Sequence, residues 1–200
     1  VLNGSQSTNY LVISGSLSEA KPITIVSDGD IVIRATVSTS VASADIILVA
    51  DNDGDGHGGV IIAPSGFLSS AANIRLQGSD TLTYGDVLDS IVIQKDFALN
   101  QLEAAGSITL APNAAAPAGA AVQVEGYLKA GAGGVSIASS GAIALGTQID
   151  ATGGDVAFQS PVTLTANTLV TTVNPDGPDG DVAFSSTVDG NTDIYLVNAD

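Results

Sequence analysis

Short runs in which apolar residues alternate with small or polar ones recur along the chain, each after a Gly, Asn, Asp or Ser. Ile108-Thr109-Leu110 and Val156-Ala157-Phe158 are examples. Because successive side chains of a strand point to opposite faces, this alternation predicts short strands with one buried face and one exposed face. The preceding residues tolerate positive φ or bond their own backbone, so we expect each to turn a corner before its strand.

Nine copies of this unit occur, and their first apolar positions are Ile31, Ile46, Ile74, Ile91, Ile108, Val135, Val156, Val182 and Ile194. The gaps between these positions are 15, 28, 17, 17, 27, 21, 26 and 12 residues, with a mean of about 20, which suits one turn of a β-solenoid. We therefore predict an all-β fold, a parallel β-solenoid, as a single elongated repeat region over residues 1–200. The nine positions are expected to stack as one interior ladder, with variable turns between them.

The alternative fold is a tandem pair of antiparallel β-sandwiches, which also has short strands separated by frequent turns. Asn-Gly and Asp-Gly hairpin signals occur at few junctions, which favours the solenoid. The least strand-like stretch, residues 97–105, is compatible with one or two helical turns. No other stretch has the 3.6-residue period of a helix.

The excess of acidic residues limits the kinds of molecule that the chain can bind. The chain has 21 acidic and 5 basic residues and a formal net charge of -16, which opposes binding to nucleic acid or to anionic lipid surfaces. Polar residues interrupt every apolar run, so we expect no membrane insertion. The chain begins with Val1 and has no basic leader segment, so we expect it to be part of a longer protein.

Two stretches carry a family resemblance, Gly153-Gly154-Asp155-Val156-Ala157-Phe158 and the run from Asp181 to Gly190. In them the chain resembles the bacterial repeat exoproteins of the filamentous-haemagglutinin and autotransporter-like types. The resemblance implies a right-handed β-helix in an extracellular or bacterial cell-surface protein with a structural or adhesive role. It also implies that the partners are further coils or neighbouring subunits, and host or matrix glycans.

The sharpest local signal is the acidic segment from Asp51 to His57. Asp51, Asp53 and Asp55 precede Gly56 at the spacing of the first half of an EF-hand loop, so these three residues are the candidate ligands of a Ca²⁺ ion. Position 12 of that pattern is Ile62 instead of Glu, which rules out a complete EF-hand. The simpler interpretation is a solvated acidic turn. The segment from Asn174 to Asp181 is a weaker metal candidate, because its two prolines favour a rigid turn.

Catalysis has little support in the sequence. The single histidine, His57, lies between glycines, and the cations are scattered, so we predict no enzyme activity. The alternative function is a β-helix carbohydrate-active enzyme or a carbohydrate-binding module, since such proteins can use paired acids. Threonines at Thr81, Thr83, Thr163 and Thr165 also raise ice binding, but two short arrays are few for a flat surface.

The ends of the chain are expected to be contact surfaces. Residues 193–198 form a strand-like run with no capping segment after it. An uncapped solenoid end exposes apolar side chains and unpaired backbone groups. Val1-Leu2 and Leu196-Val197 are therefore predicted to meet further coils or neighbouring subunits.

Overall fold

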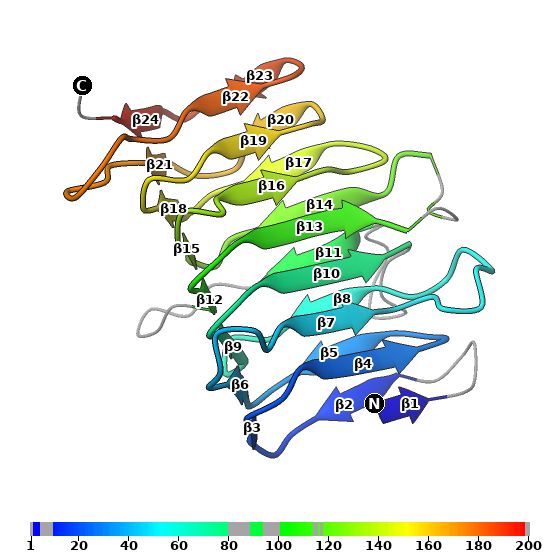
Figure 1. Ribbon diagram of the computed structural model, residues 1–200. Helices are drawn as coiled ribbons and strands as arrows, with labels where there is room; N and C mark the ends of the chain where they lie inside the picture. The colour runs from blue at the N-terminus through cyan, green and yellow to red at the C-terminus, as the bar shows by residue number, and fades with distance from the viewer. Residues whose placement is uncertain are drawn as a thin grey trace.

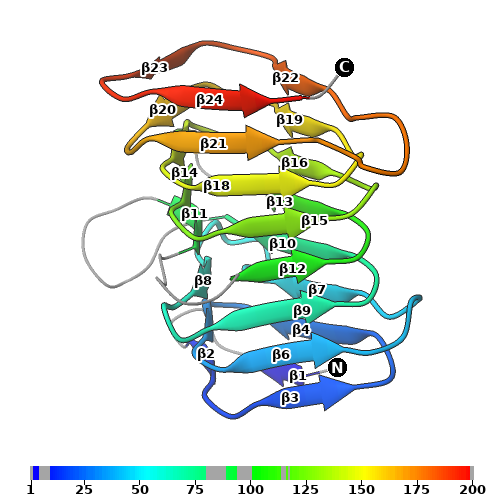
Figure 2. The ribbon, with the colours of Figure 1, turned by 90° about the vertical axis from the view of Figure 1, so that its left-hand side faces the viewer.

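The strands of the chain form three parallel sheets, which are the three sides of one elongated stack (Figures 1 and 2). The structure is a computed structural model that describes residues 2–4, 10–79, 89–93, 101–113, 116 and 118–198. Each sheet has eight strands, and every pairing is parallel, so the alternative of antiparallel sandwiches is wrong.

Sheet A consists of β1 (Leu2–Gly4), β4 (Ile23–Ser27), β7 (Ile46–Val49), β10 (Ile74–Gly78), β13 (Ile108–Pro112), β16 (Val135–Ile137), β19 (Val156–Phe158) and β22 (Val182–Phe184). Sheet B consists of β2 (Leu11–Ile13), β5 (Ile31–Ile33), β8 (Val60–Ile62), β11 (Asp89–Ile93), β14 (Ala121–Val124), β17 (Ile143–Leu145), β20 (Val162–Leu164) and β23 (Val188–Gly190). Sheet C consists of β3 (Leu17–Glu19), β6 (Thr36–Thr39), β9 (Phe67–Ser70), β12 (Leu102–Ala104), β15 (Leu128–Ala130), β18 (Gln148–Ala151), β21 (Thr168–Thr171) and β24 (Ile194–Val197).

The chain visits sheets A, B and C in turn, so each coil contributes one strand to each sheet, from coil 1 (β1 to β3) to coil 8 (β22 to β24). This is the predicted parallel β-solenoid. The helical turn with which residues 97–105 are compatible does not occur in the described part, since 102–104 is strand β12 and residues 97–100 lie outside the described ones. No helix that could cross a membrane occurs among the described residues.

The predicted interior ladder is confirmed in part. Six of its nine positions pair in succession along sheet A: Ile46, Ile74, Ile108, Val135, Val156 and Val182. The other three do not belong to this ladder, because Ile31 and Ile91 lie in sheet B and Ile194 lies in sheet C. The predicted coil length of about 20 residues is therefore too short, since the sheet A positions are 21 to 34 residues apart.

The core is a continuous column of inward-facing Ile, Leu, Val and Ala side chains from all three sheets. In sheets A and C the inner residues are buried and the middle residues are partly or fully exposed, as the alternation predicts. Sheet B departs from this pattern in β5, β8 and β11, where the middle residues Val32, Ile61 and Val92 are apolar and buried as well. Near the end of the stack, the rings of Phe158 and Phe184 lie parallel with centroids 4.8 Å apart.

A polar ladder follows the corners. We call the residue directly before a strand its lead residue. Asn73, the lead residue of β10, donates its N–H to Asp45 Oδ1 at 3.0 Å and accepts the N–H of Ser107 on its own Oδ1 at 2.9 Å. Asp181 donates its N–H to Asp155 Oδ1 at 2.9 Å. These lead residues therefore join one coil to the next through a side-chain oxygen, whereas the sequence predicted only local turn chemistry for them.

The same bond occurs at the other two corners. In sheet B, Gly59 donates its N–H to Asp30 Oδ1 at 2.8 Å, and in sheet C, Asp193 donates to Asn167 Oδ1 at 3.2 Å. The oxygen always belongs to the lower-numbered coil and the N–H to the next one. This shared chemistry explains why the same sequence unit precedes strands of all three sheets.

Candidate functional site

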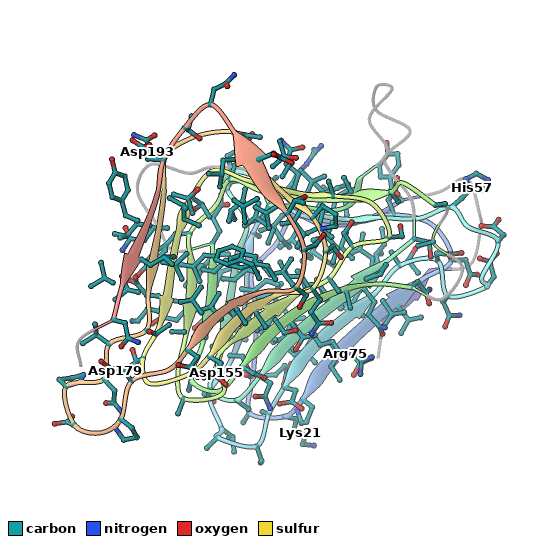
Figure 3. All side chains as sticks on the ribbon, turned by 90° about the horizontal axis from the view of Figure 1, so that it is seen from above. Lys21, His57, Arg75, Asp155, Asp179 and Asp193 are labelled. Carbon is teal, nitrogen blue, oxygen red and sulfur yellow. The ribbon has the colours of Figure 1, made fainter. Side chains whose placement is uncertain are left out.

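The candidate metal site lies in the loop of residues 50–59, which connects β7 to β8 at the corner between sheets A and B. His57, which marks this loop, stands at a different corner from Asp179 and from Asp193 (Figure 3). The flanking elements are strands instead of the helices of an EF-hand. Ile62, at position 12 of the pattern, is fully buried in the core and offers no ligand.

The loop brings its three predicted ligands together. One carboxylate oxygen from each of Asp51, Asp53 and Asp55 lies within 4.8 Å of the others. Asp51 is fully buried, while Asp53 and Asp55 are exposed. The structure thus gathers three acidic side chains that could hold a metal ion.

The backbone of the loop has positive φ angles at Asp51 and at three of its glycines. Asp51 has a φ of 52°, and Gly54 and Gly56 have φ values of 73° and 89°, a region that Gly enters freely and Asp tolerates. Asp51 Oδ1 accepts the N–H of Gly56 at 3.3 Å, and Asp55 Oδ1 accepts the N–H of His57 at 3.0 Å. Each of these two carboxylates therefore has one oxygen oriented by the backbone of the loop.

The second oxygen of Asp51 is the unusual group of the site. Asp51 Oδ2 is buried and has no hydrogen-bond partner, and the buried hydroxyl of Ser79 on the next coil has none either. A buried polar atom without a partner is costly, and a bound ion or water commonly satisfies it. Asp51 Oδ2 is therefore a buried carboxylate oxygen that a bound cation or water could satisfy.

The electrostatics agree with this geometry. Burial raises the pKa of the Asp51 carboxyl above its usual value, and the negative charge of Asp55 raises it further. The hydroxyl of Ser79, although it makes no hydrogen bond of ordinary geometry, and the N–H of Gly56 act in the opposite direction on this pKa. A cation at this position would favour the charged form of Asp51.

Residues of coil 2 and of coil 5 contact the loop from its two sides. Asn52 Nδ2 donates to Asp28 Oδ1 at 3.2 Å in the coil below. From above, Asn113 Nδ2 donates to the carbonyl of Asp51 at 2.8 Å. Gly58 fits only without a side chain, because a Cβ there would lie 2.7 Å from the backbone nitrogen of Asp51. The sequence missed Asp28, Ser79 and Asn113, which only the stacking of coils brings to the site.

The second metal candidate is a turn that bonds itself. Asp179 Oδ1 accepts the N–H of Asn174 at 2.6 Å, and Asn174 Oδ1 accepts the N–H of Asp176 at 3.1 Å. Within the part of the chain that the structure describes, Asp51, Asp53 and Asp55 form the only group of three or more His, Cys, Asp or Glu residues that could hold a metal ion. The rigid turn is the interpretation that the contacts support.

A shallow groove of 330 Å³ lies on the outer face of sheet C and the corner that follows it. Its charged residues, Glu103 and Lys129, pair with each other at 2.6 Å across β12 and β15. Beside it, the hydroxyl of Tyr127 donates to Asp150, and burial together with this carboxylate raises the pKa of Tyr127 well above its usual range. The groove is otherwise lined by small residues such as Thr39, Ser69 and Gly131, and no sequence motif predicts it.

The threonines considered for ice binding do not form a described array. Thr163 is exposed on β20 and Thr165 is exposed just after it, whereas Thr81 and Thr83 lie outside the described residues.

No protein-family model matches the chain, and neither does any curated protein or solved structure. The resemblance to filamentous-haemagglutinin-type exoproteins therefore stays a prediction from the quoted motifs, and so does the hand of the coil.

Proposed function

We propose that the chain is a structural and adhesive segment of an extracellular surface protein, in which stacked coils form a rod that joins further coils or neighbouring subunits. The supporting observation is that eight coils stack in register around one continuous core. A narrow core of small aliphatic residues lengthens by adding coils without changing its cross-section. Such a rod suits a spacer or coat, and the glycan partner and bacterial surface location rest on the resemblance.

Self-association tests the assembly part of this function. We expect the 200-residue chain to associate as its concentration rises, because unpaired strand edges and exposed apolar side chains favour pairing with another chain. Removal of residues 194–200, which takes away β24, should weaken this association. Sedimentation velocity over a range of concentrations measures both effects. A sharp monomer peak at the highest concentration would remove end-to-end assembly from the proposal.

The ion that the acidic loop binds is Ca²⁺. Its ligands are oxygens only, and Ca²⁺ accepts six to eight oxygen ligands, including carboxylates, backbone carbonyls and water, in flexible geometry. Mg²⁺ requires a stricter octahedron and keeps most of its water. Three carboxylates, one of them buried with a free oxygen, supply the negative charge, and the exposed side of the loop is open to water. The ion would hold the loop closed at a corner of the rod.

Calorimetric titration with Ca²⁺ tests this site. We expect one Ca²⁺ per chain, and we expect Asp53→Asn/Asp55→Asn to weaken binding by roughly 100-fold or more, because it removes two of the three charged ligands. Both side chains are exposed, so the variant should stay folded. The matched control, Asp176→Asn/Asp189→Asn, changes the net charge equally and should bind like the wild type. Equal binding by the two variants, or tighter binding of Mg²⁺ than of Ca²⁺, would contradict the proposal.

A further inference from the structure

The end of β10 lies directly against the acidic loop that connects β7 to β8. Ala50 donates its N–H to the carbonyl of Gln77 at 3.0 Å, and Ser79 donates its N–H to the carbonyl of Gly58 at 2.8 Å. In Figure 1 the loop after β7 and the carboxyl end of β10 lie on the same side of the stack. Coil 4 is therefore bonded to both ends of a loop that belongs to coil 3.

The side-chain hydroxyl of Ser79 makes no contribution to the hydrogen bonding of the described part of the chain. Ser79 is fully buried, and its Oγ has no hydrogen-bond partner among the described residues. Asp51 Oδ2 is in the same state in the loop below. Most buried polar atoms in proteins are paired, so each of these two oxygens calls for a partner that neither coil supplies.

Ser79 and Asp51 are neighbours in space. Gly58, which accepts the N–H of Ser79, lies so close to Asp51 that a Cβ on the glycine would come within 2.7 Å of the Asp51 nitrogen. Burial raises the pKa of the Asp51 carboxyl, and the nearby hydroxyl of Ser79 acts against this rise. Neither oxygen is paired within the described part of the chain, so both keep lone pairs that a cation can use.

We propose that the hydroxyl oxygen of Ser79 is a further ligand of the Ca²⁺ ion held by Asp51, Asp53 and Asp55, so that the ion joins coil 4 to coil 3. This inference rests on the calcium site of the proposed function and adds to it a ligand from the next coil. A serine hydroxyl offers two lone pairs on a hard oxygen, the kind of atom that Ca²⁺ prefers. Water on the exposed side of the loop completes the roughly six to eight oxygens that Ca²⁺ takes.

A ligand from coil 4 changes what calcium does to the rod. An ion held by coil 3 alone orders one loop, whereas an ion shared by two coils also opposes the separation of β7 from β10, which pair in sheet A. An ion that binds only the folded state stabilises that state by mass action, and here the binding state requires that the two coils are stacked. Calcium therefore stabilises the contact between coils 3 and 4 as well as the loop.

Calorimetric titration of Ser79→Ala with Ca²⁺ tests the ligand. We expect this variant to bind Ca²⁺ roughly 10-fold more weakly than the wild type, because the ion loses one neutral oxygen. The matched control is Thr172→Val, which should bind Ca²⁺ like the wild type. Thr172 follows β21 in coil 7, and its Oγ1 is likewise buried without a hydrogen-bond partner among the described residues. Each variant removes only an unpaired hydroxyl, so both should stay folded.

Metal selectivity distinguishes a ligand from a residue that only supports the loop. Ser79→Cys puts sulfur at the position of the hydroxyl oxygen, and the chain has no cysteine of its own. Ca²⁺ favours oxygen, whereas Cd²⁺, an ion of nearly the same size, favours sulfur. We expect Ser79→Cys to lose Ca²⁺ affinity as Ser79→Ala does, and to bind Cd²⁺ roughly 10-fold or more tightly than Ser79→Ala does. The control Thr172→Cys should keep the Ca²⁺ affinity of the wild type.

The outcomes separate the Ser79 ligand from the calcium site itself. Wild-type Ca²⁺ affinity in Ser79→Ala, or Cd²⁺ binding by Ser79→Cys no tighter than by Ser79→Ala, would overturn the ligand from coil 4 and leave the three aspartates as the site. An equal loss of Ca²⁺ affinity in Ser79→Ala and Thr172→Val would overturn it as well. No binding of Ca²⁺ by the wild-type chain would defeat both proposals.

Discussion

Replacement of Ile74 by Asp is expected to abolish cooperative folding of the chain. Ile74 is fully buried at the centre of sheet A, between Ile46 of β7 and Ile108 of β13. Loss of the buried side chain costs about 1.5–3 kcal/mol, and a buried unpaired carboxylate adds several kcal/mol more. Together these approach or exceed the roughly 5–15 kcal/mol that separates folded from unfolded proteins. Circular dichroism during urea unfolding should show little or no native baseline.

The matched control is Arg75→Asp, one residue along the same strand. Arg75 is exposed on the outer face of sheet A, and it is labelled there in Figure 3. This variant introduces the same acid and changes the net charge even more, but it buries nothing, so we expect an effect of about 0.5 kcal/mol or less. Similar unfolding midpoints for the two variants would contradict the inward direction of Ile74 and the position of the core.

The strands could be predicted from the sequence because their signal is local. Val135-Ser136-Ile137 alternates apolar and polar residues, and the structure buries Val135 and Ile137 while Ser136 stays partly exposed. The assignment of strands to sheets could not be predicted in the same way. Ile31 and Ile194 follow an Asp as Ile46 does, because the lead residues of all three sheets make the same hydrogen bond between successive coils. Corner lengths vary, so spacing alone does not identify the sheet.

In the acidic loop, too, the local arrangement could be predicted from the sequence and the contacts with other coils could not. The spacing of Asp51, Asp53 and Asp55 was sufficient to predict that the three carboxylates converge. The burial of Asp51 could not be predicted, because the chain that surrounds it comes from other coils. Ser79 is 28 residues away in sequence and Asn113 is 62 residues away. Such neighbours become visible only when the register of coils is known.

Because Asp51 is buried, we expect Asp51→Asn to change the melting temperature in opposite directions with and without calcium. A carboxyl whose pKa is higher in the folded than in the unfolded state stabilises the fold at low pH, and this contribution is lost as pH rises from the ordinary carboxyl pKa of about 3.9 through the folded value. At neutral pH and without metal, the charged side chain therefore lowers stability. Asp51→Asn removes that charge.

Asparagine fits the site well. Its Oδ1 can accept the N–H of Gly56 as Asp51 Oδ1 does, and its amide nitrogen replaces an oxygen that has no hydrogen-bond partner. Asn also tolerates the positive φ of this position. Without calcium at pH 7, we expect Asp51→Asn to melt at a higher temperature than the wild type. This difference in melting temperature should shrink as the pH falls towards the ordinary carboxyl pKa, because the wild-type carboxyl takes up its proton.

With calcium the order should reverse. A ligand at 100 times its Kd stabilises the folded state by about 2.7 kcal/mol, which raises the Tm of a chain of this size by about 5–10 °C. The wild type should show this rise, and Asp51→Asn should lose most of it because the buried ligand has no charge. The control Asp53→Asn changes an exposed ligand, so it should lose calcium stabilisation without any gain in the metal-free state. Scanning calorimetry of the three proteins, with chelator and with Ca²⁺, measures each difference. Metal-free Asp51→Asn melting below the wild type at pH 7, or keeping the full calcium shift, would show that the buried carboxylate is not the centre of the site.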